Sequence, residues 1–218
     1  MIKRKKIFLI FSAISLIAYH VLDGHFTRGM NRLRAGHFDL AMEIFEEAMS
    51  DEVESVDKIE AQYGMALCYW YGVEDVSPDR KLAAEMLENL INSEMRKSDI
   101  AALTNAYYLL GLYYYGEGNN EKQALEYMGE AARRGYALAQ FRLGRYYFNK
   151  SQESWLDVCG EYTPSDERAI EYLSAAVNNI NLSRRNREQA LEMLREIDVS
   201  YPELPWWQQF MHYVMTAK

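Results

Sequence analysis

One short pattern is written three times along this chain: a leucine, a small residue directly after it, and two aromatic residues close behind. It reads LCYWY at residues 67–71, LGLYY at 110–114 and LGRYY at 143–147. An alanine and a glutamate two positions apart follow each copy, at residues 83–85, 124–126 and 169–171. Tandem units of this kind indicate a solenoid, in which each unit packs against its neighbours and which most often binds other proteins.

The spacing of the pattern fits one pair of helices per unit. The small residues lie 43 and 33 residues apart, and helical-pair repeats have periods of about 33 to 47 residues. Apolar residues recur with helical spacing inside each unit, and glycines follow the helical segments where C-caps are expected. The sequence therefore predicts an all-α fold, an α/α solenoid of helical hairpins.

The predicted organisation has four parts. They are a signal anchor or transmembrane helix over 1–24, a degenerate helical hairpin over 25–58, repeats over 59–182 with an insertion at 148–166, and capping helices over 183–218. Insertions in solenoids fall on loops, often at the binding face. The insertion is therefore either a contact loop or a solvated loop, and the sequence leaves both open.

The recurring residues have expected packing roles. The small residue of each copy, Cys68, Gly111 or Gly144, should let a second helix approach closely. Cys68 is thus expected to be a small buried residue rather than a reactive one. The last tyrosine of each copy, Tyr71 in the first, should bury its ring and keep its hydroxyl at the rim.

The stretch AARRGYALAQFRLGRYY, residues 131–147, closely resembles the Sel1-like repeat, a tetratricopeptide-like unit. The resemblance extends over roughly residues 60–180, although the turn of the middle unit is shorter than the family's and the third unit carries the insertion. It implies an α/α solenoid with an adaptor role. Exported members of the family resemble envelope, secretion-associated, host-interaction and immunity proteins.

The N-terminus predicts a membrane anchor. Four basic residues at 3–6 precede an uncharged apolar run at 7–22, the order found in secretory signals and signal anchors. Small residues at suitable cleavage positions are lacking, which favours an uncleaved anchor. Basic residues stay cytoplasmic, so we expect a single-pass inner-membrane protein with its repeat domain in the periplasm. Secretion to the periplasm after signal cleavage and a buried N-terminal helix are the alternatives.

Charge and cysteine content narrow the possible partners. The net charge is −8 although four basic residues stand at the N-terminus, so the rest of the chain repels phosphate backbones and favours a basic partner. Nucleic acid is not expected. An oxidising compartment would permit a disulfide between Cys68 and Cys159, but the burial expected for Cys68 argues against it.

The aromatic residue before the last tyrosine of each copy is a candidate contact residue, because Tyr and Trp are common hot spots of protein interfaces. The alternative is that this aromatic ladder packs between units. Neighbouring aromatic and basic residues and a tryptophan of the insertion complete the expected partner-binding set: Tyr69, Trp70, Tyr108, Tyr113, Arg142, Arg145, Tyr146 and Trp155.

No enzyme is expected, because the four histidines are scattered and no nucleophile elbow, phosphate loop or metal-ligand spacing occurs. Neither a cofactor nor a small-molecule substrate is implied. The sequence favours a non-enzymatic adaptor or scaffold of the bacterial envelope that binds a protein through the concave face of its repeats. A toxin-neutralising immunity protein is a narrower version that only the resemblance supports. The alternative is a structural component of an envelope or secretion assembly that self-associates through Trp206 and Trp207.

Overall fold

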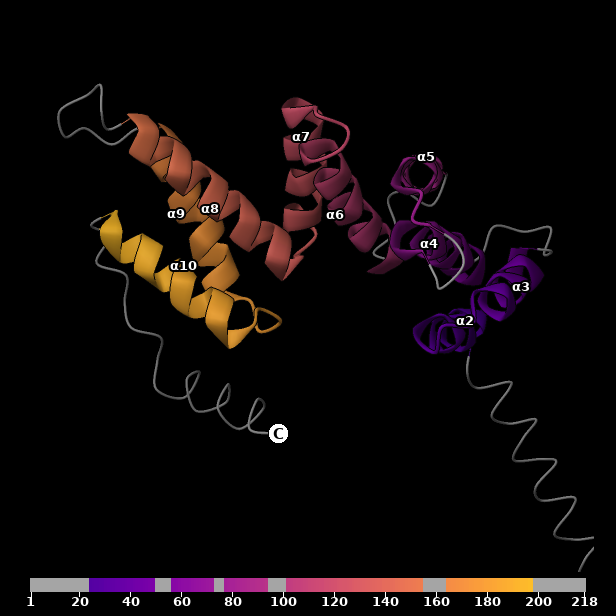
Figure 1. Cartoon of the computed structure of the whole chain (residues 1–218). Coiled ribbons are helices and arrows are strands. Elements are labelled where there is room, and N and C mark those ends of the chain that lie inside the picture. The colour runs from indigo at the N-terminus through magenta and orange to yellow at the C-terminus, as the bar shows by residue number, and fades with distance from the viewer. Residues whose placement is uncertain (1–23, 50–55, 73–76, 94–100, 155–163, 198–218) are drawn as a thin grey trace, which may run out of the picture. The chain divides into compact units, whose positions relative to one another are not determined.

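The described part of the computed structural model is built from helices and turns, with no strand (Figure 1). It covers residues 24–49, 56–72, 77–93, 101–154 and 164–197. The helices are α2 His25–Arg34, α3 Phe38–Met49, α4 Val56–Tyr71, α5 Arg80–Ile91, α6 Ala101–Tyr115, α7 Glu121–Arg133, α8 Ala137–Ser154, α9 Pro164–Asn178 and α10 Arg184–Glu196. This confirms the prediction of an α-helical repeat fold.

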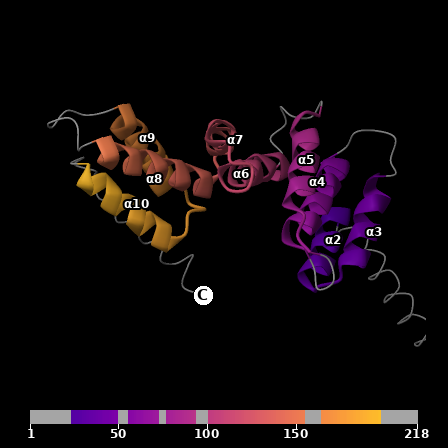
Figure 2. The same ribbon diagram turned by 45° about the horizontal axis from the view of Figure 1, so that its top comes forward.

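The chain divides into two compact units, Met1–Tyr113 and Tyr114–Lys218. In the first unit α2, α3 and α4 pack against one another, and α5 packs against α4. In the second unit α7 packs on α8, α8 packs along α9, and α10 lies against both α8 and α9, as Figures 1 and 2 show. The contacts between α4 and α5 and between α8 and α9 pair these helices as the repeat spacing predicts.

The first unit is built around Phe45 of α3, whose side chain is fully buried. Its ring occupies the space that side chains at Gly29 of α2 and Gly64 of α4 would need, because a Cβ at either glycine would overlap it. Cys68 lies in the same apolar cluster and is also fully buried. Burial raises the pKa of the Cys68 thiol to about 12, so the thiol stays protonated and unreactive at neutral pH. This confirms the expected packing role of Cys68, whereas Cys159 lies outside the described residues.

The helix starts follow from local capping chemistry. The Asp79 carboxylate accepts a hydrogen bond from the backbone N–H of Leu82 at 2.9 Å and caps α5. The side chains of Asn120 and Ser183 do the same for α7 and α10. Each cap satisfies one N–H that lacks a partner in the first turn. The helix begins where the sequence offers this oxygen.

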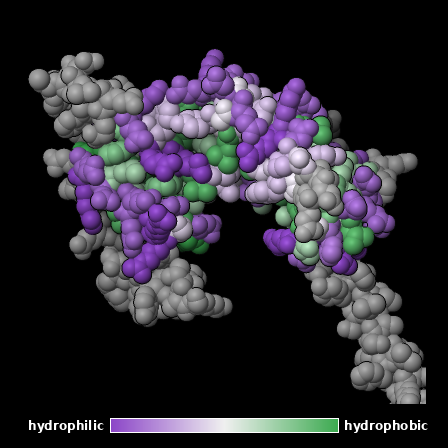
Figure 3. Space-filling model, in the orientation of Figure 1, coloured by the Kyte–Doolittle hydropathy of each residue, from purple (hydrophilic) through white to green (hydrophobic). Residues whose placement is uncertain are grey.

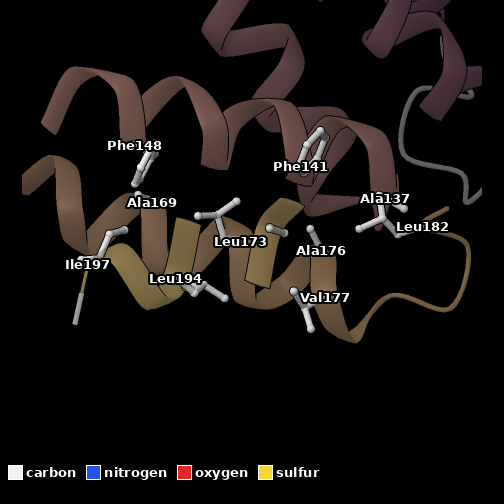
Figure 4. Packing of buried hydrophobic residues seen from close by; sticks show 11 residues of the cluster. Ala137, Phe141, Phe148, Ala169, Leu173, Ala176, Val177, Leu182, Leu194 and Ile197 are labelled. Carbon is white, nitrogen blue, oxygen red and sulfur yellow. The ribbon is translucent and has the colours of Figure 1, made fainter. Parts of the chain in front are cut away.

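The second unit has its tightest helix contact at Gly144 of α8. A Cβ at this position would lie 2.6 Å from Leu173 Cγ and 2.9 Å from the Leu173 backbone nitrogen of α9. Only a residue without a side chain permits that approach. Leu173 is fully buried, and Figure 4 shows it among the apolar side chains gathered between α8, α9 and α10.

A single side chain ties the two turns of this unit together. Asn179, after α9, donates hydrogen bonds to the backbone carbonyl of Gly135 at 2.8 Å and to the Gln140 side chain at 3.0 Å. The backbone carbonyl of Asn179 accepts a hydrogen bond from the Arg187 guanidinium of α10 at 2.7 Å. Gly135 has a φ of +83°, a left-handed conformation that glycine adopts at helix C-termini. The turn between α7 and α8 is therefore held against the turn between α9 and α10.

Two expectations need revision. Part of the predicted insertion at 148–166 is helical, because α8 continues to Ser154 and α9 begins at Pro164. The prediction that the last tyrosine of each copy is buried is wrong for Tyr71, which is 65% exposed, while Trp70 before it is buried. The helix end at Gly72, with a φ of +65°, places Tyr71 in the last turn and toward solvent.

The expected anchor at 7–22 and the capping segment that contains Trp206 and Trp207 lie outside the described residues. Among the helices that the structure describes, none combines the length and the apolar character needed to cross a membrane.

The Gly144 contact makes a prediction with an internal control. Replacing Gly144 with Ala should lower the free energy of unfolding by about 1–3 kcal/mol, because the new methyl group forces α8 and α9 apart. Gly129 lies in the interior of α7, and no atom lies within 4 Å of the position its Cβ would take. Replacing Gly129 with Ala should therefore raise the free energy of unfolding by about 0.5–1 kcal/mol, because alanine has the higher helix propensity. Urea unfolding followed by circular dichroism measures both, and equal effects of the two substitutions would contradict the packing role of Gly144.

Candidate functional site

The predicted contact residues of the first unit are largely occupied in packing. Trp70 and Tyr108 are each 7% exposed, while Tyr69 and Tyr113 are half-buried. The Trp70 ring carries the Arg80 guanidinium 5.5 Å above its centre. Trp70 and Tyr108 therefore offer little free surface, whereas Tyr69 and Tyr113 keep part of their side chains exposed. Trp155 lies outside the described residues.

Tyr146 of the second unit belongs to a group of three polar side chains from α7 and α8. Its hydroxyl donates a hydrogen bond to a carboxylate oxygen of Glu121. The Lys150 ammonium lies 3.4 Å from the same oxygen and 4.9 Å from the centre of the Tyr146 ring. Tyr146 thus combines a cation–π contact with a charge-assisted hydrogen bond.

A second layer continues this group across α8 and α9. The rings of Tyr147 and Tyr172 are stacked, with centroids 5.9 Å apart and planes 8° from parallel. The Arg168 guanidinium lies 5.3 Å from the centre of the Tyr147 ring and donates a hydrogen bond of 3.4 Å to its hydroxyl. The Tyr146 and Tyr147 rings meet edge to face at 5.1 Å. We call the six residues from three helices the tyrosine cluster: Glu121, Tyr146, Tyr147, Lys150, Arg168 and Tyr172.

The tyrosine cluster has a defined charge pattern. The Tyr146 hydroxyl, followed by Lys150, holds the pKa of Glu121 below its usual range. Partial burial, followed by the hydrogen bond to Glu121, raises the pKa of Tyr146, and partial burial is also the main cause that raises the pKa of Tyr172. At neutral pH the cluster therefore carries neutral tyrosines, one carboxylate and two cations.

The tyrosine cluster suits protein recognition better than catalysis. All three tyrosines are half-buried, so each ring is fixed by its neighbours while part of it faces solvent. Rigid aromatic side chains bind partners at a low cost in conformational entropy. On the face shown in Figure 3 hydrophilic residues predominate and hydrophobic residues form smaller areas between them.

Sequence reasoning named Tyr146 of this cluster as a candidate contact residue. It did not name Glu121 or Lys150, nor the two residues of α9, Arg168 and Tyr172. Both belong to the second helix of the third repeat, at the residue before Ala169 and three after it. The alanine marks the buried face of α9, so residues beside that face border the neighbouring helix. The same periodicity that identified the repeat carried the signal for these two positions.

Arg142 and Arg145, also expected at the site, lie elsewhere on α8. They border a groove of about 300 Å³ between α8 and α10, and they do not belong to the tyrosine cluster. The side chains at the groove are Leu138, Phe141, Arg142, Arg145, Arg185, Asn186 and Gln189. The sequence analysis grouped Tyr146 with Arg142 and Arg145 on one surface, but in the structure they lie on two separate surfaces.

Within the part of the chain that the structure describes, no three His, Cys, Asp or Glu side chains are placed to hold a metal ion.

Comparison with known proteins gives a family match. The model of the Sel1 repeat matches residues 59–90, 104–136 and 137–179. No curated protein matches the chain. Among solved structures the chain is similar to an immunity protein from Pseudomonas aeruginosa, with 15% identity, 77% of this chain and 81% of that chain covered, and a TM-score of 0.31. Such a score supports no argument about fold or function.

The hydrogen bond between Tyr146 and Glu121 can be tested by titration. Replacing Tyr146 with Phe should raise the pKa of Glu121 toward its usual value, because the hydroxyl is the main cause of the lowered pKa. The carbon-13 NMR shift of the Glu121 carboxyl carbon measures this, with Tyr115→Phe as the control. A lowered folded-state pKa adds stability that is present above the unfolded-state pKa. That stability is lost as pH falls through the folded-state pKa, so the Phe variant should lose less stability on acidification. An unchanged Glu121 pKa would contradict the hydrogen bond.

Proposed function

Because the chain belongs to the Sel1 repeat family, we propose that it is a non-enzymatic adaptor that binds a partner protein through the tyrosine cluster. Sel1 repeats indicate a protein-binding scaffold. The observation that supports the finer proposal is the packing of Tyr146, Tyr147 and Tyr172 beside Lys150 and Arg168 on two adjoining helices, α8 and α9.

The energetics of interfaces favour such a cluster. Tyrosine and arginine are enriched among the few residues that dominate binding energy, and they act best where neighbours exclude water. Tyr147 is already stacked on Tyr172 at 5.9 Å, so ordering these rings on binding costs little further entropy. A partner that covers the cluster gains aromatic contact area together with hydrogen bonds at the hydroxyls.

The charge distribution suggests where a basic partner would bind. Residues 24–113 contain 16 acidic and 8 basic residues, whereas residues 114–218 contain 15 and 12. Outside the N-terminal segment, most of the acidic excess therefore lies in residues 24–113, and a basic region of the partner is drawn to them. The tyrosine cluster, with two cations and one carboxylate, supplies the aromatic contacts.

The cellular location is a further part of the proposal. We place the repeats in the periplasm, held to the inner membrane through residues 7–22, because basic residues precede that apolar run. Release after signal cleavage is the alternative. A toxin-neutralising role is a narrower form of the proposal and rests on the family resemblance alone. A self-associating structural component of an envelope or secretion assembly remains the alternative function.

Charge reversal within the tyrosine cluster tests the binding surface. The double change Lys150→Glu and Arg168→Glu should lower recovery of the partner from an envelope fraction at least tenfold, because both cations next to the rings are lost. The matched control is Lys81→Glu with Arg184→Glu, which reverses two exposed cations outside the cluster. Quantitative mass spectrometry of affinity-purified material measures recovery, and thermal melting verifies folding. Equal recovery with both folded variants would reject the tyrosine cluster as the binding surface.

A reporter fusion tests the location. Residues 1–25 fused to an enzyme that is active only after export should give an active product that sediments with membranes at full size. The changes Ile10→Lys and Leu16→Lys should abolish activity, because each charge in an apolar span costs about 2.5–3.5 kcal/mol at its centre. A shortened, soluble and active product would indicate cleavage, and an inactive wild-type fusion would reject export.

A further inference from the structure

The groove between α8 and α10 is a second surface, separate from the tyrosine cluster. We propose that it binds an acidic segment of a partner protein, in which carboxylates flank an apolar or aromatic side chain. This proposal goes beyond the adaptor function above and stands on other residues. Three arginines, two amides and two apolar residues line the groove, and none of the seven is acidic.

The floor and walls of the groove differ in chemistry. Phe141 is 3% exposed and belongs to the core of the second unit, so it forms a fixed apolar floor beside Leu138. The Arg145 guanidinium lies 5.7 Å from the centre of the Phe141 ring, which orients the cation without neutralising it. A ligand here meets a small apolar area, mainly at the partly exposed Leu138, with positive charge at its edge.

Two of the three arginines keep their charge available. Arg145 and Arg185 are exposed, and neither forms an ion pair within the part of the chain that the structure describes. The nearest acidic side chain along α10, Glu188, is held by Arg184 at 2.8 Å. The guanidinium groups that face the groove are therefore free to pair with carboxylates, which they bind in a bidentate manner.

The chemistry of the groove favours an acidic peptide over other anions. A polynucleotide would extend beyond this small groove onto the rest of a chain of net charge −8, and a lone phosphate makes no use of Leu138. Asn186 and Gln189 supply amide groups that donate to and accept from a peptide backbone. A volume of about 300 Å³ is at the lower end of ligand pockets, which suits one side chain and its flanking charges.

Direct binding of defined peptides tests the proposal. The probe is a fluorescein-labelled peptide of sequence Glu-Asp-Phe-Asp-Glu, and its counterpart is Gln-Asn-Phe-Asn-Gln, both measured by anisotropy against the full chain. The acidic peptide should bind at least tenfold more tightly, and its affinity should fall with added salt. Equal binding of the two peptides would overturn the proposal.

Variants of the second unit locate the site. The double change Arg145→Gln and Arg185→Gln should weaken binding of the acidic peptide at least tenfold. The control Lys122→Gln with Arg195→Gln removes the same charge outside the groove and should change the affinity less than twofold. Equal loss in the two variants would reject the groove, because it would show an effect of net charge alone. Unfolding curves show that each variant is folded.

Other occupants are excluded in the same series. Full displacement of the peptide by an equal concentration of inorganic phosphate would show a simple anion site, and tighter binding of a labelled oligothymidylate would show a nucleic-acid site. The chain alone is also compared by sedimentation with the variant Arg145→Gln and Arg185→Gln. The wild-type chain should form no oligomer that is lost in this variant. Such an oligomer would assign the groove to a second copy of the chain. Each of these three results would overturn the proposal.

Discussion

Close contact between helices at glycine is the constraint on which both units depend. In the second unit the backbone of α8 at Gly144 touches Leu173 of α9, and in the first unit Gly29 and Gly64 leave room for Phe45. A short helix pair cannot bury its apolar face alone, so stability comes from neighbouring helices that approach closely enough to exclude water. Glycine provides that proximity at a small cost in helix propensity.

The same contact builds the tyrosine cluster. Tyr147 follows Gly144 by three positions on α8, and Tyr172 precedes Leu173 on α9, so the glycine contact fixes the separation of the two rings. Their parallel stacking at 5.9 Å follows from backbone proximity one turn away. A small residue that recurs in the repeat motif for packing thereby determines the geometry of a surface, and this links the motif to the proposed recognition.

The sequence predicted what local chemistry decides. Glycines were expected after the helical segments, and Gly135 after α7 adopts the left-handed conformation typical of that position. The sequence predicted the wrong aromatic residue of a pair to be buried, because Trp70 and Tyr71 differ by about 100° around α4 and the choice depends on neighbouring helices. Nor did it predict Asn179, whose role requires two turns that are 44 residues apart. The periodicity of apolar residues does not predict contacts between segments that are far apart in the sequence.

Adjacent positions of one helix supply two different surfaces. Arg145 faces the groove beside α10, whereas Tyr146 contacts Glu121 of α7, because successive residues are rotated by about 100° around a helix. The position of Arg145 is Tyr69 in the first copy of the pattern and Leu112 in the second. The shared motif thus sets the helix packing, while its variable third position determines surface chemistry. In the third repeat that position is basic where α10, rather than another repeat, covers the helix pair, so the groove is a property of this end of the array.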